Sequence, residues 1–208
     1  MICRNILRGL TSWHHQTLSA WTMVVLLVSS VSKYILLPKN IPRAIILSHI
    51  LLHTPFSLVY HCSHNKVVND YNIYYVKGDV IMIYISHFIL HIGLLWRVPW
   101  GVKSICYMIM FCACYNAIEN IVKIDDVKLV TKTGLSYSWI FLLHYIPIFM
   151  MKGWQFGVYH LTLFSVILCI YKYKVLAMLF RVNDISIDNA FMHCGLIISN
   201  LIALEGFY

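Results

Sequence analysis

The sequence predicts an all-α integral-membrane protein, folded as a bundle of seven transmembrane helices. Of its 208 residues, 60% are hydrophobic and only 12% are charged, whereas about a quarter of the residues in a soluble domain carry charge. Seven stretches without Lys, Arg, Asp or Glu approach the roughly 20 residues that a helix needs to cross the hydrocarbon core. Hydrocarbon admits only helices and closed barrels, and apolar runs of this length indicate helices.

We expect a single membrane domain over residues 1–208, with spans joined by short connections. In chain order, the spans are expected at residues 16–37, 43–64, 74–96, 102–122, 133–151, 153–175 and 185–205. The first run is long enough to be a span rather than the apolar part of a cleaved signal peptide. The second run follows Pro38-Lys39-Asn40-Ile41-Pro42, whose prolines mark a break between helices.

Polar and proline-containing segments separate the later spans. The segment Trp96-Arg97-Val98-Pro99-Trp100 divides the third span from the fourth, and Lys152-Gly153 divides the fifth from the sixth. The stretch from Glu119 to Lys132 is the longest polar one, and we expect it to connect spans four and five. The fourth and seventh runs are short, so their helices are expected to continue past a flanking charge by tilting or snorkelling.

The basic residues are distributed between the apolar runs, although the formal net charge is +8. This distribution fits membrane topology rather than a nucleic-acid groove, so we expect no nucleic-acid partner. Leaving Lys77 uncounted, the side of the membrane that holds the N-terminus carries nine Lys and Arg residues and the other side six. The positive-inside rule then favours a cytosolic N-terminus, in the plasma membrane or an endomembrane. The seven cysteines form no CxxC pair and are expected to be buried small side chains.

Polar residues at helical spacing set the second, third and seventh spans apart. Span two carries four of them at successive i, i+4 positions on one helix face: His49, His53, Ser57 and His61. Span three begins near Asp79, and span seven begins near Asp188, Asn189 and His193. Ionisable side chains are costly at membrane depth and usually mark a functional site.

The topology predicts that some of these residues meet. His61 ends span two, Asp79 begins span three and His193 lies in the first turns of span seven, so all three face the side that holds the N-terminus. Zinc binds imidazole nitrogens readily, and a catalytic zinc site has three protein ligands and one position for water. Bound zinc lowers the pKa of that water to about 7, which allows hydrolysis of an amide or ester. In such a site Asp79 would receive the proton or orient the water, and Ser57 would support His61 or the oxyanion.

These residues resemble the polar cluster of the CREST superfamily of seven-span membrane proteins. The superfamily includes alkaline ceramidases, progestin and adipoQ receptors, haemolysin III proteins, post-GPI-attachment lipases and the muscle fusogen myomaker. Ser57-x-x-x-His61 followed by Asp79 is similar to the receptor and haemolysin pattern, and Phe191-Met192-His193-Cys194-Gly195-Leu196 is similar to the myomaker branch. The resemblance implies a zinc ion held by one histidine of span two and a His-x-x-x-His motif of span seven. His61 and His193 would be ligands, with Ser57 and Asp79 as catalytic residues.

The chain departs from this pattern at Asn189, which stands four residues before His193 where the resemblance implies a histidine. An amide is a poorer zinc ligand than imidazole or carboxylate. Asp188 or His64 would then have to supply the third bond, or the metal is weakly bound or absent.

Two functions follow as hypotheses. The leading one is a zinc-dependent hydrolase of a lipid amide or ester, whose substrate enters from the bilayer. The alternative is a catalytically degenerate receptor, or a myomaker-like membrane-fusion or remodelling protein, in which the polar cluster is structural; Asn189 favours it. A transporter or rhodopsin-like receptor is less favoured, because the third span ends in Leu94-Leu95-Trp96-Arg97 without an acidic–arginine pair.

Each polar residue also has a simpler interpretation. Histidines in membrane helices often form hydrogen bonds between helices, which is what we expect for the six others in the spans: His49, His53, His87, His91, His144 and His160. Asp79 could pair with Lys77 or cap span three. Ser57 could bond a carbonyl of its own helix, and Asp188 could be a helix-start residue near a positive dipole end.

Overall fold

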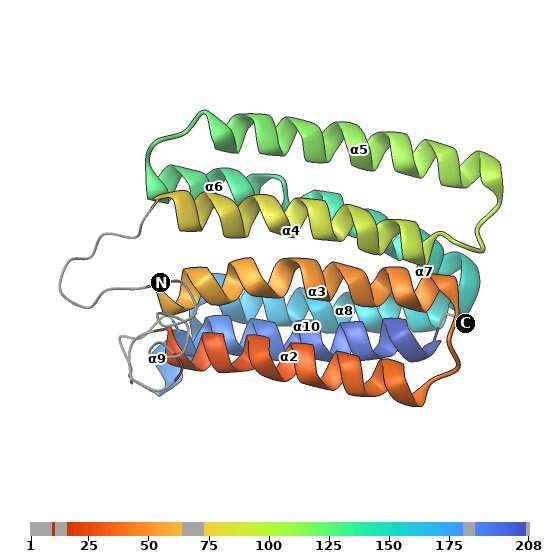
Figure 1. The fold of residues 1–208 in the computed structure, drawn as a ribbon, viewed down its shortest axis with the longest axis horizontal. Coiled ribbons are helices and arrows are strands. Elements are labelled where there is room, and N and C mark those ends of the chain that lie inside the picture. The colour runs from red at the N-terminus through yellow and green to blue at the C-terminus, as the bar shows by residue number, and fades with distance from the viewer. Residues whose placement is uncertain (1–9, 11–15, 64–72, 181–185, 207–208) are drawn as a thin grey trace.

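The computed structural model describes residues 10, 16–63, 73–180 and 186–206, and within these ranges it contains helices and no strand (Figure 1). In chain order the elements are α2 (Thr17–Leu36), α3 (Ile41–Cys62), α4 (Ile73–Leu94), α5 (Trp100–Val122), α6 (Val127–Ser136), the 3₁₀ helix η1 (Ser138–His144), α7 (Tyr145–Lys152), α8 (Trp154–Tyr173), α9 (Val175–Leu179) and α10 (Ser186–Gly206). Seven segments are long and apolar enough to cross a membrane, with α6, η1 and α7 together forming the fifth. The chain is therefore a multi-pass seven-helix membrane bundle, as the sequence predicts.

The prediction of a long polar connection between spans four and five is wrong. Helix α5 continues to Val122 and α6 begins at Val127, so only a short turn separates them. The charged residues at the end of α5 lie on its outer face, where Lys123 pairs with Glu119 at 2.6 Å, while Ile121 on the inner face is fully buried. A polar run can therefore be helical when its apolar residues keep the helical period.

The fifth span changes helix type in its middle. Its first part, α6, is followed by the 3₁₀ segment η1, and α7 completes the crossing. Pro147 lies in the first turn of α7, where its missing N–H removes the hydrogen bond that a continuous α-helix would make to the carbonyl of residue 143. The proline thus explains why the helix restarts here, and the 3₁₀ turn that precedes it ends at His144.

Local signals explain the other helix boundaries. The Asn40 side chain accepts a hydrogen bond from the Arg43 N–H at 2.9 Å and caps α3, and Asp126 does the same for the Leu129 N–H at 2.7 Å in α6. The turn between α7 and α8 needs a backbone φ of +83° at Gly153, a conformation that glycine adopts without strain.

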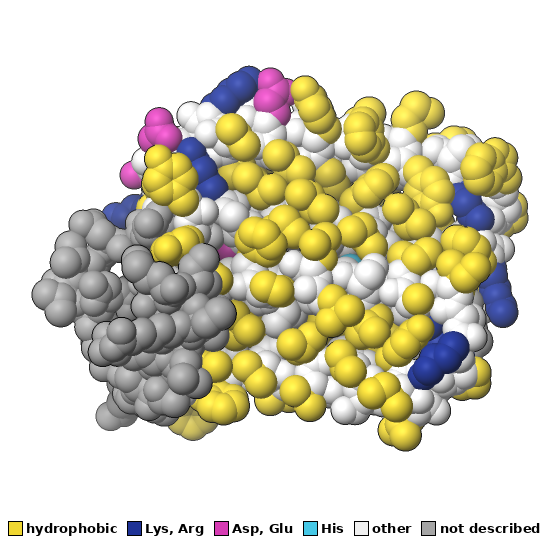
Figure 2. All heavy atoms as spheres, in the orientation of Figure 1, with side chains coloured by type: hydrophobic (Ala, Val, Ile, Leu, Met, Phe, Trp, Pro, Cys, Tyr) yellow, Lys and Arg dark blue, Asp and Glu magenta, His cyan; other side chains and the backbone are white. Residues whose placement is uncertain are grey.

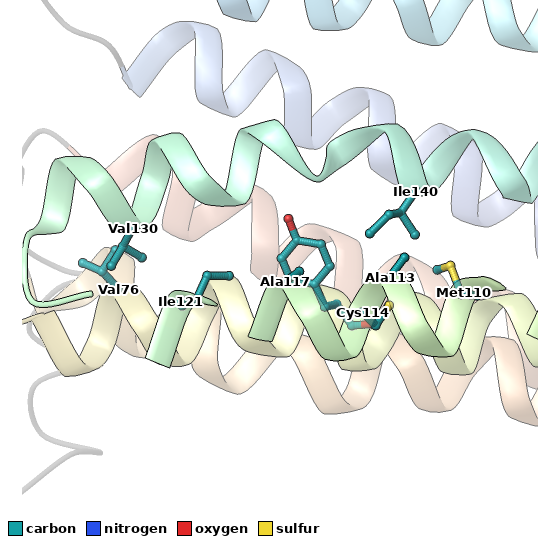
Figure 3. Close-up of a cluster of buried hydrophobic side chains, with 9 residues drawn as sticks. Val76, Met110, Ala113, Cys114, Ala117, Ile121, Val130 and Ile140 are labelled. Carbon is teal, nitrogen blue, oxygen red and sulfur yellow. The ribbon is translucent and has the colours of Figure 1, made fainter. Parts of the chain in front are cut away.

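The helices lie nearly parallel, and α5 runs along one edge of the bundle (Figure 1). It packs on α4 and on the fifth span through one of the buried clusters (Figure 3), made of Val76, Tyr84, Met110, Ala113, Cys114, Ala117, Ile121, Val130 and Ile140. The small side chains of Ala113, Cys114 and Ala117 let the backbones approach closely, as in many membrane helix pairs. Tyr84 anchors the fifth span by donating a hydrogen bond to the Gly134 carbonyl at 2.5 Å.

The surface has the pattern expected of a bilayer protein. On the face drawn in Figure 2, hydrophobic side chains cover the middle of the bundle, and charged side chains gather toward its two ends. We call the end where α3 finishes and α4 begins the Asp79 side, and the end with the α4–α5 connection the Arg97 side. On the Arg97 side, the buried Arg43 guanidinium donates hydrogen bonds to the carbonyls of Leu204 at 2.9 Å and Pro38 at 2.7 Å.

Candidate functional site

A cavity of about 330 Å³ runs inside the bundle and is lined mostly by apolar side chains. Helices α2, α3, α4, α8 and α10 and the fifth span all contribute to its wall. The polar face of α3 points into it, because the four residues at i, i+4 spacing, His49, His53, Ser57 and His61, all line the cavity. The helical spacing in the sequence therefore identified a real common face.

His61 and His193 lie side by side at the Asp79 side of the cavity. Their ring centroids are 5.3 Å apart, with the rings edge to face at 69°, and both side chains are buried. These residues are 132 positions apart in the sequence, so the shared depth that the topology predicted corresponds to a real meeting point of α3 and α10.

Helix α2 orients both imidazoles. The His61 Nδ1–H donates to the Gln16 amide oxygen at 3.1 Å, and the His193 Nδ1 lies 2.9 Å from the Thr22 hydroxyl. Because the Thr22 hydroxyl donates its own proton to the Ser19 carbonyl at 2.7 Å, its oxygen accepts from His193. Both rings therefore carry their proton on Nδ1 and their lone pair on Nε2.

Asp79 lies in the same polar cluster and pairs with a residue that the sequence analysis treated as a simple inter-helix histidine. The His53 Nε2 donates to the Asp79 carboxylate at 3.2 Å, and this carboxylate also interacts electrostatically with His61 and His193. Lys77, the alternative partner, instead binds Asp125 at 3.2 Å and the Val122 carbonyl at 2.9 Å. This bond joins α3 to α4, so the expected inter-helix hydrogen bond of His53 is confirmed. The i, i+4 spacing showed a shared face on α3 but not that Asp79 would be the partner.

Two polar residues at the start of α10, the acidic Asp188 and the amide Asn189, form hydrogen bonds with other parts of the protein. Asp188 is fully buried, and its oxygens accept the backbone N–H groups of Leu176 at 2.9 Å and Ala177 at 3.1 Å, which caps α9. Asn189 donates to the Ser19 hydroxyl at 3.0 Å. This geometry favours the helix-start interpretation of Asp188 over its predicted role as a metal ligand, because both oxygens serve the first turn of a neighbouring helix.

The described residues do not form a complete metal site. Over residues 16–63, 73–180 and 186–206, no group of three or more His, Cys, Asp or Glu side chains is arranged to hold a metal ion. A catalytic zinc site uses three protein ligands, and the cluster offers two imidazoles, His61 and His193. The predicted ligand His64 lies outside the described residues. Ser57 is buried and lines the cavity next to the pair.

A second polar cluster lies deeper in the bundle. His87 Nδ1 is 3.0 Å from His144 Nε2, and His91 Nδ1 is 3.1 Å from His144 Nδ1. The expectation of inter-helix hydrogen bonds is confirmed for these three histidines. It also holds for His160, which lies 3.3 Å from the Tyr145 hydroxyl and 3.2 Å from the Ser199 hydroxyl. The i, i+4 spacing of His87 and His91 was the only sequence signal of this cluster.

Comparison with known proteins gives no relative: no protein-family model, curated protein or solved structure matches this chain.

Proposed function

We propose that this chain is a lipid-binding membrane protein, catalytically degenerate relative to the CREST hydrolases that it resembles, and of the receptor or membrane-remodelling type. One observation carries the proposal: a single cavity joins a polar cluster at one end to apolar walls along the bundle. Its volume of about 330 Å³ falls in the usual range for small-molecule sites, roughly 300–1,000 Å³.

The two ends of the cavity suit the two ends of an amphiphile. Its polar end has hydrogen-bonding groups from His53, His61 and His193, together with the Asp79 carboxylate. Farther along, Leu90 and Phe164 offer apolar surface for an acyl chain. With the N-terminus in the cytosol, as the basic residues predict, the lipid headgroup would lie toward the cytosolic leaflet.

The bonding of the polar residues supports a non-catalytic site. Asn189 occupies the position of the third histidine and is bonded to Ser19, and Asp188 caps α9. The Asn189 bond connects α10 to α2 and the Asp188 bonds connect α10 to α9, so this part of the cluster holds helices together. A structural network of this kind keeps the polar end of the cavity in one shape.

Lipid retention tests the proposal. The protein is purified from a membrane in mild detergent, and bound lipids are counted by native mass spectrometry. Leu90→Trp overfills the cavity, at a cost of about 1–3 kcal/mol, and is expected to weaken lipid binding at least about tenfold. Leu51→Trp, on the exposed outer face of α3, is the matched control and should retain lipid. Unmodified protein without bound lipid, or equal retention by both variants, contradicts the proposal.

The second candidate is a zinc-dependent lipid amide or ester hydrolase. It is favoured by the tautomers of His61 and His193, since metal-binding histidines usually donate their other ring N–H to a protein acceptor. This function requires a third ligand from outside the described residues. Turnover of fluorescent ceramide or phospholipid by the unmodified protein, lost in both His61→Ala and His193→Ala, would establish this candidate over the first.

A further inference from the structure

Three buried histidines form a continuous hydrogen-bonded chain between α4 and the fifth span. His144 stands in the middle: its Nε2 is 3.0 Å from His87 Nδ1, and its Nδ1 is 3.1 Å from His91 Nδ1. The His87 and His144 rings also stack, with centroids 5.2 Å apart and planes at 22°. Both ring nitrogens of the central residue are thus engaged by imidazoles.

This arrangement has a specific chemical capacity. A neutral imidazole has one N–H donor and one lone-pair acceptor, so a central ring that is bonded at both nitrogens can accept a proton on one and release a proton from the other.

The two ends of the histidine chain lie in different surroundings. His87 and His144 line the central cavity. His91 is fully buried outside the cavity wall, and its Nε2 has no hydrogen-bond partner in the described part of the chain. Burying a polar nitrogen without a hydrogen-bond partner costs about 1–3 kcal/mol of stability. The presence of such a nitrogen at His91 therefore points to a species that binds it. His91 is three residues from the end of α4, or about 4.5 Å from the Arg97 side.

The break in the fifth span positions the central histidine. His144 is the last residue of η1, immediately before α7. A short 3₁₀ stretch inside a helix often marks a functional position, since it changes the direction in which side chains point. The turn also stacks Phe141 on His87, with ring centroids 4.1 Å apart, so the His87 ring packs against both Phe141 and its partner His144 in the bonded arrangement.

Among the described residues, the side chains that act electrostatically on His87 and His144 are other histidines. The groups acting on His87 and His144 are imidazoles: His49 and His53 of α3, besides the members of the chain. From α5, the Tyr107 ring lies 6.3 Å from His91, and from α7 and α8, Tyr145 pairs with His160. No carboxylate acts on His87, His91 or His144 among the residues that the structure describes.

We propose that His87, His144 and His91 relay protons between the central cavity and the Arg97 side, giving the bundle a transmembrane proton pathway. When no acyl chain fills it, the cavity supplies the other half of the path, since it extends to His61 and Asp79 at the opposite end. Asp79 and His91 are 12 residues apart on α4, which corresponds to about 18 Å along the helix axis. This distance is more than half of the roughly 30 Å thickness of the hydrocarbon core.

The transfer balances without any added reagent. A hydronium in the cavity gives its proton to the His87 Nε2 lone pair and leaves as water. The His87 Nδ1 proton moves to His144 Nε2, and the His144 Nδ1 proton moves to His91 Nδ1. The His91 Nε2 proton then leaves to water on the Arg97 side. One proton enters and one leaves, and all three rings end neutral, each in its other tautomer. The next transfer requires each side chain to turn so that its N–H again points toward the Arg97 side and its lone pair toward the cavity.

Proton flux into vesicles tests the relay. The full chain is reconstituted in liposomes that contain a pH-sensitive dye, and a potassium gradient with valinomycin drives protons inward. His144→Phe keeps an aromatic ring but has no nitrogen. His160→Phe is the matched control, because His160 is a buried histidine of the same cavity that lies outside the relay. We expect acidification at least about tenfold faster for the unmodified protein than for His144→Phe or empty vesicles, and an unchanged rate for His160→Phe.

A second variant, His91→Gln, keeps a polar side chain and removes the ring that ends the relay. This variant is expected to lose the proton flux as His144→Phe does. It replaces His144→Phe as the test if gel filtration shows that the phenylalanine variant does not fold. The proposal is overturned if unmodified protein conducts no faster than empty vesicles, or if a folded His144 or His91 variant keeps the full rate.

Discussion

Replacing Asp188 with alanine is expected to loosen one end of the bundle without emptying a metal site. The carboxylate accepts the Ala177 N–H in buried surroundings and the Leu176 N–H in partly buried ones. An orphaned buried donor costs about 1–3 kcal/mol, and the loss of a helix cap typically costs about 1 kcal/mol. We therefore expect Asp188→Ala to lower the free energy of unfolding by about 2–4 kcal/mol, which lowers Tm by at least about 5 °C.

A thermal-unfolding assay in detergent gives this Tm: the exposed thiols of Cys112, Cys169 and Cys194 are blocked first, and a thiol-reactive dye then follows the buried thiols of Cys62, Cys106 and Cys114. Asp188→Asn retains one acceptor oxygen and should lose about half as much stability, whereas Asp125→Ala, at an exposed carboxylate, should be close to the unmodified protein. The capping account predicts that a chelator leaves every Tm unchanged. It is refuted if a chelator lowers the Tm of the unmodified protein as far as Asp188→Ala does, since Asp188 would then act through a metal.

Three further changes and one control substitution test the packing by the same assay. A Cβ at Gly93 would lie 2.8 Å from Ile46 Cγ1, so Gly93→Ala should destabilise the α3–α4 interface by about 1–3 kcal/mol. Gly101→Ala, which meets nothing within 4 Å, should be neutral. Arg43→Met removes hydrogen bonds to the carbonyls of Leu204 near the end of α10 and of Pro38 in the α2–α3 connection and should lower Tm; an unchanged Tm would show that water replaces them. Tyr84→Phe loses one hydrogen bond to a carbonyl of the fifth span and should lower the free energy of unfolding by about 1 kcal/mol. A variant as stable as the unmodified protein would contradict this expectation.

The bilayer explains why the spans could be predicted from the sequence. Hydrocarbon thickness fixes the length of an apolar helix, so apolar runs alone located six spans to within a few residues. The fifth span was placed too late, because Lys128 and Lys132 made its first turns read as a connection. Its change to a 3₁₀ helix was not predicted, since Pro147 at the start of a helix and Pro55 within one look alike in sequence.

The polar sites were predictable only as far as helical faces and membrane depth determine them. These two rules predicted that His61 and His193 lie close together, because the depth of each residue in the membrane follows from the topology. Rotation of one helix against another does not follow from either rule. For that reason the pairing of Asp79 with His53, and of His144 with both histidines of α4, appears only in the folded chain.

Helix α2 has a role in the site that its apolar sequence did not indicate. Gln16 and Thr22 orient the two central imidazoles, and Ser19 binds the Asn189 amide. In the proposed degenerate site, a histidine in place of Asn189 would have to replace the bond between Asn189 and Ser19. Building a site of three histidines therefore means exchanging a structural contact for a ligand.

The zinc content of Asn189→His measures most directly whether the polar cluster is a degenerate metal site. Asn189 is one helical turn before His193, so a histidine there completes a set of three imidazoles with His61. Asn200→His, farther along the same helix and also lining the cavity, is the matched control. We predict little zinc in the unmodified protein and in Asn200→His, and about one ion per chain in Asn189→His. One zinc per unmodified chain, lost in His61→Ala, would contradict the account and establish a metal site.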